Sequence, residues 1–471
     1  MGTNKDQLQA HQFMLQRVIS ALAVQETDPE QPPFRRPTMA AIAGIIIGIL
    51  SCGAVWVFGL LVPGGNKFTA TDVIAVEEET GATFVLMDGR LHPVLNYTSA
   101  LLALDKHAEV RIVSHATLAG IPPGAPIGIP DAPTSLPGKD QLLSGGWSVC
   151  SQSTTDAQGG SRQDTVVLVG HTPERSSALN GRAAVVLANG RKYLLYQGFK
   201  HEFPADAELA LGMGNLSEPL VAGPWLDTVP TGVAVGPMGV TNAGKASTAV
   251  PGKSLVAGQL LVVNDGPDNG TEDITAPQYY LVLADQLKSI SPLQAAVQGV
   301  FDARAATPVD VGNRELAGAV RTPPETSKKG DLPRDIPRYA QFDEPDAAVC
   351  ALFQPGENTP QILVSASLSA DDRGSGSTTP SPDGTLRVAV PAGKAALVEV
   401  MTSPSQPPGA GTIALVNDQG KLHALLDPQH VQQVLGYDGV VPVRITDVLA
   451  NRVPKAGALG PDQARVPATG G

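Results

Sequence analysis

Residues 39–62 read MAAIAGIIIGILSCGAVWVFGLLV, a stretch that contains no charged side chain. Because an α-helix rises ~1.5 Å per residue, this stretch is long enough to cross the ~30 Å hydrocarbon core of a bilayer. Arg35 and Arg36 stand just before it, whereas the charges that follow are mostly acidic. Positive charge beside a membrane span tends to stay in the cytoplasm. The sequence therefore predicts a single-pass protein of the cytoplasmic membrane, with a cytoplasmic N-terminus and residues 63–471 on the extracytoplasmic side.

A cleaved signal peptide is the alternative interpretation of this stretch. The apolar region of a signal peptide usually spans about 7–15 residues and precedes a cleavage site made of small residues. No A-x-A site follows Val62, and the residues around Arg35 and Arg36 lack the pattern of a twin-arginine signal. We therefore expect an uncleaved transmembrane helix over residues 39–62.

Residues 1–38 carry the pattern of an amphipathic helix. Apolar residues recur there at spacings of three and four, interrupted by one glutamine. They include Leu8, Leu15, Ile19 and Leu22. Short helices gain most of their stability from packing of the apolar face, so this face is expected to contact a partner protein or the membrane surface. Few Lys or Arg residues accompany it, which favours a partner protein.

Composition limits what the rest of the chain can be. Of its 471 residues 42% are hydrophobic, so a sizeable core is available. Gly (50) and Pro (41) are frequent but stay below the level of a disordered chain. A net charge of −12 argues against nucleic acid as a partner, because phosphate binding requires a basic face. We expect a folded extracytoplasmic domain with many turns.

Two of the three cysteines lie in this outer part of the chain. Cys150 and Cys350 are predicted to face an oxidising compartment, where a disulfide between them is the first expectation. Two free, buried thiols are the alternative. A metal site is less favoured, because no other Cys or His stands at ligand spacing from either residue. Cys52 lies within the apolar stretch and is expected to be a small packing residue.

The outer domain repeats one pattern, an apolar run, a turn and a second apolar run. The four copies are Phe84–Val94, Val185–Leu195, Tyr279–Ser289, which is degenerate, and Ile413–Leu425. Asp88-Gly89 and Asn189-Gly190 predict two-residue hairpin turns, because a type I′ turn requires positive φ at both central residues. A short helix is expected after at least three copies, with Ser291-Pro292 and Asp427-Pro428 as an N-cap followed by proline.

A shared exit segment rich in proline and glycine follows three copies. Its three occurrences are Leu118–Gly124, Leu226–Gly232 and Leu449–Pro454. Cys150 falls between the first and second copies and Cys350 between the third and fourth, which indicates a duplication. We predict a β-rich α+β domain in which four hairpin-plus-helix repeats surround a disulfide-linked central domain with pseudo-two-fold symmetry. The expected boundaries are repeats at residues 81–137, 182–240, 279–317 and 411–456, central parts at 140–175 and 340–400, and a disordered tail at 457–471.

Catalytic motifs are absent from the sequence. Gly252-Lys253-Ser254 resembles the end of a P-loop, but Ser247 stands where that motif needs its first glycine. The histidines show neither an H-E-x-x-H motif nor a paired spacing for zinc. His92 and His423 recur at matching repeat positions, where packing beside the turn explains them better than metal binding. The sequence therefore predicts no enzyme, no cofactor and no metal site.

Several segments together resemble the EccB family of type VII secretion systems. They are Gln7–Phe13, Arg35–Pro37, Leu118–Gly124 with Leu136-Pro137, and the cysteine pair, in family order along the whole chain. The resemblance implies a structural, non-catalytic subunit of the type VII membrane core, supporting protein export across the cytoplasmic membrane. A membrane-anchored protein that binds the cell wall on its own is the alternative function.

The resemblance also implies the partners. The N-terminal tail and the anchor are expected to bind the core subunits EccC, EccD and EccE, and the outer domains of several EccB copies to associate. A mycosin protease and peptidoglycan are further expected contacts of the outer domain.

Overall fold

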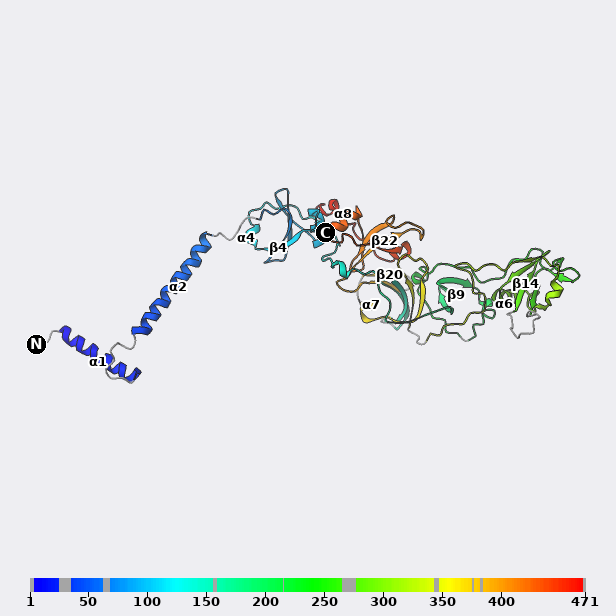
Figure 1. Cartoon of the computed structure of the whole chain (residues 1–471), viewed down its shortest axis with the longest axis horizontal. Coiled ribbons are helices and arrows are strands. Elements are labelled where there is room, and N and C mark those ends of the chain that lie inside the picture. Colours follow the sequence, from blue (N-terminus) through cyan, green and yellow to red (C-terminus); the bar gives the residue numbers. More distant parts are fainter. Residues whose placement is uncertain are drawn as a thin grey trace. The chain divides into compact units, whose positions relative to one another are not determined.

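A computed structural model describes residues 4–24, 35–61, 68–155, 159–214, 216–264, 277–342, 347–374, 377–381 and 384–468. Contacts divide the chain into two units. The first comprises residues 1–70, 77–81 and 112–122, and the second the remainder. The helices of the first unit are α1 Asn4–Val24, α2 Arg35–Leu61 and α4 His115–Leu118 (Figure 1). The amphipathic and apolar stretches of the sequence thus both form helices, whereas Val62 lies outside the described residues.

The centre of the second unit is a seven-stranded sheet with the strand order β20-β21-β6-β5-β18-β19-β7. Its strands are β5 Trp147–Thr155, β6 Ser161–Leu168, β7 Arg175–Ala178, β18 Ala348–Phe353, β19 Gln361–Ser367, β20 Ser377–Ser381 and β21 Gly384–Ala389, with α7 Ala370–Gly374 beside β21 and β6. β5 and β18 pair antiparallel, and Cys150 and Cys350 stand opposite each other in that pair. A disulfide joins them, with an S–S distance of 2.07 Å. The predicted pairing is confirmed.

Four smaller sheets each begin with three consecutive strands. The strands are β1 Val73–Glu77, β2 Thr83–Met87 and β3 Arg90–Pro93; β8 Ala184–Ala188, β9 Arg191–Tyr196 and β10 Phe199–Phe203; β13 Leu260–Val263, β14 Gln278–Val282 and β15 Leu287–Ile290; and β22 Ala396–Met401, β23 Thr412–Val416 and β24 Leu422–Ala424. Further strands at the edges are β4 Glu109–Val113, β16 Val309–Asp310, β17 Arg321–Thr322 and β25 Val443–Thr446, and β11 Ala246–Ser247 pairs with β12 Leu255–Val256. A hairpin meander is therefore the common element of the four sheets.

A helix or a 3-10 turn follows each meander. These elements are α3 Tyr97–Leu104, η2 Ala205–Glu208, α6 Pro292–Phe301 and α8 Pro428–Val434. The remaining short elements are η1 Lys139–Gln141, η3 Asn313–Leu316, α5 Gly223–Leu226, α9 Asp447–Ala450 and α10 Pro461–Ala464. Each exit segment expected from the sequence begins at the end of a four-residue helix, namely α4, α5 or α9.

The two predicted N-caps differ in the structure. Ser291 accepts a hydrogen bond from the Gln294 N–H, and Gln294 bonds back to the Ser291 N–H, which completes a capping box. Asp427 stands at the N-cap position of α8 but has a φ of 53° and makes no capping hydrogen bond through its side chain. Asp427 therefore stands at the predicted N-cap position before Pro428, but of the two predicted caps only Ser291 makes a side-chain capping hydrogen bond.

The second copy of the repeat was placed one hairpin too early. The turn at Asn189-Gly190 exists, with φ of 51° and 71°, but it joins β8 to β9. The hairpin that corresponds to β2–β3 and β23–β24 is β9–β10, whose turn is Gln197-Gly198 with φ of 49° and 81°. Asn-Gly is the stronger hairpin signal of the two, so the pattern in the sequence favoured the wrong turn.

The third strand of each meander pairs with a later stretch of the chain. In three copies this stretch is an exit segment or the residue just after it, and in the third copy it is β17. Parallel pairing at this position occurs four times, as Leu91 with Pro123, Lys200 with Thr231, Leu287 with Arg321 and Leu422 with Lys455. This parallel pairing of the third strand thus recurs in all four sheets. The pseudo-two-fold arrangement of these sheets around the centre stays a prediction: β21 pairs parallel with β6, whereas β7 pairs antiparallel with β19.

Residues 457–468 are ordered, contrary to the prediction of a disordered tail from residue 457. Within it, α10 packs on α3, and Arg465 Nε donates to the Ala103 carbonyl at 3.0 Å. Pro467 pairs with Ile127, and the Ala468 N–H donates to the Pro126 carbonyl. Composition misled the prediction, because this segment rich in Ala, Gly and Pro forms the short helix α10 and an isolated β-bridge instead of a flexible chain.

Candidate functional site

The apolar face of α1 is exposed in the isolated chain. Its four predicted contact residues have exposed fractions of 59% for Leu8, 47% for Leu15, 40% for Ile19 and 80% for Leu22. An exposed apolar face is removed from water only when another surface packs on it, so this face is available for contact with a partner. Whether it binds a partner stays a prediction.

Within α2, residues Met39–Val57 form a helix long and apolar enough to span a membrane, and none of it is buried inside the protein. Arg35 and Arg36 are the first two residues of the same helix. A continuous helix from this charged start into the apolar stretch places the two arginines next to the expected membrane boundary.

The disulfide lies in the core of the central sheet. Cys150 and Cys350 are both 0% exposed and pack against Val166, Leu168 and Leu363. Trp225 of α5 is also fully buried, and its Nε1 donates to the Val149 carbonyl at 2.9 Å. The bond therefore fastens two sequence-distant strands inside a packed region and is shielded from solvent reductants.

Three histidines make the same contact with the chain just after an exit segment. The Nδ1 atoms of His92, His201 and His423 lie 2.9, 2.7 and 2.8 Å from the carbonyl oxygens of Ala125, Val233 and Gly457. A carbonyl can only accept, so each Nδ1 carries the proton. The predicted role beside the turn matches this geometry, since each ring fixes the exit against the third strand.

His201 was missed in the sequence because its hairpin was misplaced. It follows Gln197-Gly198 as His92 follows Asp88-Gly89. His201 and His423 are 0% exposed, and burial lowers the pKa of both rings. Their Nε2 atoms have no hydrogen-bond partner among the described residues. These rings are therefore neutral packing groups at physiological pH.

The P-loop-like tripeptide lies in a turn. Gly252 has a φ of 78°, and Lys253 forms an ion pair with Glu315. The next regular element is the strand β12, whereas a P-loop leads into a helix whose N-terminus faces the phosphates. Lys253 is thus engaged by a carboxylate and is not held in a phosphate-binding loop.

In the described ranges, no group of three His, Cys, Asp or Glu side chains is close enough to hold a metal ion. Histidines contact carboxylates in pairs, such as His171 Nε2 at 2.8 Å from Asp372 Oδ1 and His115 Nδ1 at 2.6 Å from Glu77 Oε1. Such pairs tie loops to neighbouring elements.

The family model described as "Type VII secretion system ESX-1, transport TM domain B" matches residues 2–470. This chain belongs to the EccB family. Among its EccB relatives, the "ESX-3 secretion system ATPase EccB3" of Mycobacterium tuberculosis is 26% identical over 454 residues, covering 91% of this chain and 81% of that protein. The "ESX-5 secretion system ATPase EccB5" of the same species is 29% identical over 328 residues, covering 67% and 62%.

Solved EccB-containing structures share the fold. A chain of an intact ESX-5 inner membrane complex aligns with a TM-score of 0.65 and 21% identity, covering 100% of this chain and 96% of that one. An EccB3 dimer from the ESX-3 core complex aligns with a TM-score of 0.65 and 22% identity, covering 84% and 100%. At this identity the likeness establishes the EccB fold of the chain.

Proposed function

We propose that this chain is a non-catalytic structural subunit of a type VII secretion membrane core and supports protein export across the cytoplasmic membrane. The observation that carries the proposal is the family match over residues 2–470, which includes the tail, the anchor and the outer domain in one chain. Structures with the same fold come from an ESX-5 inner membrane complex and an ESX-3 core complex.

In the proposed orientation residues 1–38 are cytoplasmic and residues 63–471 lie outside the membrane. Arg35 and Arg36 at the start of α2 support it through the positive-inside rule. The disulfide between Cys150 and Cys350 gives independent support, because such bonds form and persist in oxidising compartments.

We place the contacts with EccC, EccD and EccE on α1 and α2. Both helices expose apolar side chains, including Leu15 and Ile19 on α1. Other EccB copies are proposed to contact the outer domain, and a mycosin protease and peptidoglycan are further candidates for it. The dimer solved for the ESX-3 relative supports contacts between copies.

We propose a non-catalytic role although the EccB relatives carry the word ATPase in their names. It is supported by the turn at Gly252, by the ion pair of Lys253 with Glu315, and by the strand β12 where a P-loop would have a helix. Nucleotide hydrolysis would need a different phosphate site with its own cation and water-positioning group.

The test is gentle solubilisation of the affinity-tagged full chain from its native membrane, followed by native mass measurement and peptide identification of co-purifying proteins. We expect a large assembly that contains a multi-domain ATPase and a polytopic membrane protein. A lone monomer or dimer in every detergent would refute the secretion-core role and support the stand-alone cell-wall binder. Purified chain that hydrolyses ATP, with loss of turnover in a folded point variant, would refute the non-catalytic role.

A further inference from the structure

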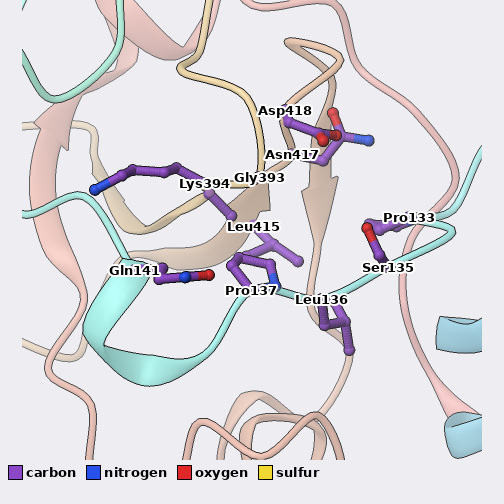
Figure 2. A pocket seen from close by; sticks show the side chains of 11 residues that line it. Pro133, Ser135, Leu136, Pro137, Gln141, Gly393, Lys394, Leu415, Asn417 and Asp418 are labelled. Carbon is purple, nitrogen blue, oxygen red and sulfur yellow. The ribbon is translucent and has the colours of Figure 1, made fainter.

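The first sheet of the outer domain has one edge that its own chain covers, and β4 forms the other edge. The exit segment lies beside β3, where Leu91 pairs with Pro123. The chain that follows, residues 133–141, lines a cavity of about 200 Å³ together with residues 415–418 of the fourth sheet (Figure 2). In the described part of the chain, no strand or bridge pairs with the outer side of β4.

The strand β4 is exposed on both faces. Four of its five residues are exposed, and only Val113 is half-buried. The Val113 carbonyl accepts the Glu78 N–H at 2.9 Å and therefore points toward the sheet. Because the backbone groups of successive residues in a strand point to opposite sides, Val110 presents its N–H and its carbonyl outward. Such an edge can pair with a further strand.

The matching edges of the other three sheets are covered or short. In the second sheet, β8 and the residue before it pair with Leu220 and Tyr339. In the third sheet, β16 has only two residues. In the fourth sheet, the Arg444 carbonyl of β25 accepts the Gly356 N–H at 2.9 Å. The long exposed edge is therefore a feature of the first sheet among these four.

The charges of β4 are complementary to those of a second copy of the same strand. Glu109 and Arg111 lie two residues apart, so their side chains stand on the same face. Both are exposed, and neither forms an ion pair with another described residue. We propose that two copies of this chain join their first sheets by antiparallel pairing of β4 about Val110. Each Glu109 then stands opposite the Arg111 of the other copy.

The outward backbone groups favour the same register. At the two-fold axis, the Val110 residues of the two copies exchange both of their N–H···O=C bonds. Glu109 and Arg111 form the neighbouring pairs without hydrogen bonds, in which side chains lie closer together. A register centred on Glu109 or on Arg111 would place like charges opposite each other, which is unfavourable.

The size of this contact limits where it can form. A stable interface between soluble proteins buries about 1,200–2,000 Å², which is more than one five-residue strand can bury. We therefore expect the pairing between chains anchored in one membrane, where the anchors raise the effective concentration of the outer domains. The inference rests on the proposed association of EccB copies and names the strand that makes it.

Cysteine crosslinking in the native membrane tests the pairing. Val110→Cys is placed in the full chain with Cys52→Ala, which removes the free cysteine. In a hydrogen-bonded antiparallel pair the two Cα atoms lie about 5.5 Å apart, within the range that a disulfide spans. We expect mild oxidation to give a covalent dimer that a reductant separates. Val320→Cys in the same background is the control for random collisions, because Val320 is 62% exposed in the third repeat.

Charge reversal tests the register. With Val110→Cys present, either Glu109→Arg or Arg111→Glu places like charges opposite each other in both pairs. Each should slow the initial rate of crosslinking roughly tenfold. The two reversals together restore opposite charges and should restore the rate. Since both residues are exposed, these changes leave the core of the first sheet intact.

Three outcomes would overturn the pairing of β4. They are a dimer yield for Val110→Cys no higher than for Val320→Cys, single reversals that leave the rate unchanged, and a double reversal that fails to restore it. A disulfide-linked product that contains a different protein, identified by its mass, would assign this edge to another partner and also overturn the proposal. Co-purification from the same membranes reports core assembly separately. An intact assembly without the crosslink would therefore remove the β4 contact and leave the secretion-core role standing.

Discussion

Cys150 and Cys350 face each other across adjacent antiparallel strands, with their Cα atoms 4.0 Å apart and 200 residues between them in sequence. β5 and β18 come from the two halves of the outer domain. Their bond therefore links parts of the chain that would be far apart in the unfolded state.

Removing this bond should destabilise the outer domain. In the chain-entropy model a loop of this length contributes roughly 5 kcal/mol at most. We expect Cys150→Ala with Cys350→Ala to lower the midpoint of chemical denaturation, followed by tryptophan fluorescence. The single variant Cys52→Ala is the control, because this cysteine is free. Equal midpoints for the double variant and the unsubstituted chain would show that the bond does not constrain unfolding.

Gly232 has no room for a side chain. A Cβ there would lie 2.3 Å from His201 Cε1 and 2.7 Å from the Gly330 carbonyl oxygen. Since His201 is buried and Gly330 is backbone, Gly232→Ala should cost about 1–3 kcal/mol of unfolding free energy, as overpacking usually does. Gly236→Ala is the matched control, since nothing lies within 4 Å of its added Cβ. A normal denaturation midpoint for Gly232→Ala would contradict the close packing of the exit.

Acid should weaken the repeats that contain His201 and His423. Burial lowers the pKa of both rings; Asp331 opposes the shift at His201, and Asp131 opposes it at His423, where Lys421 adds to it. The unfolded chain therefore binds protons first, so stability is full above the unfolded pKa of about 6.5 and falls as pH drops from there through the folded pKa.

The measurement is the thermal midpoint of the full chain in micelles between pH 8 and pH 4. His201→Asn with His423→Asn should flatten the decline, because an amide can donate to the same carbonyl without titrating. His115 and His430 have pKa values raised by Glu77 and Asp105, and they act in the opposite direction. If the thermal midpoint of the double variant falls in acid as much as that of the unsubstituted chain, titration of other groups causes the loss of stability.

The exposed face of α1 should matter for assembly. Leu15→Glu with Ile19→Glu places two charges on this face and leaves the sequence of the outer domain unchanged. We expect the recovery of co-purifying membrane proteins to fall at least several-fold in the pull-down, while the chain remains in the membrane. Lys5→Glu, at an exposed residue earlier in the same helix, is the control. Unchanged recovery would move the contact to α2 or the outer domain.

The transmembrane helix and the disulfide could be predicted because each follows from the residue types alone. An uncharged apolar run has few alternatives, and two outer cysteines imply a bond. The repeats were identified from their turn residues, but the second copy was assigned to β8–β9 instead of β9–β10. Gln197-Gly198 forms the equivalent turn to Asp88-Gly89 although its sequence is a weaker signal, and His201 was lost with it.

Tertiary contacts account for the other errors. Asp427 occupies the predicted N-cap position, but its φ is 53° and its side chain makes no capping hydrogen bond. The tail composition suggested disorder, whereas Arg465 finds its acceptor at Ala103, far away in sequence.

The pairing of Pro467 with Ile127 sets the order in which the outer domain can mature. In the proposed orientation the chain emerges from the membrane starting at its anchor, so the region of Ile127 emerges well before Pro467. Domains usually fold as their chain emerges, N-terminal parts first. Here the first region outside is the last to be completed, and a chain truncated before α10 would leave it unfinished.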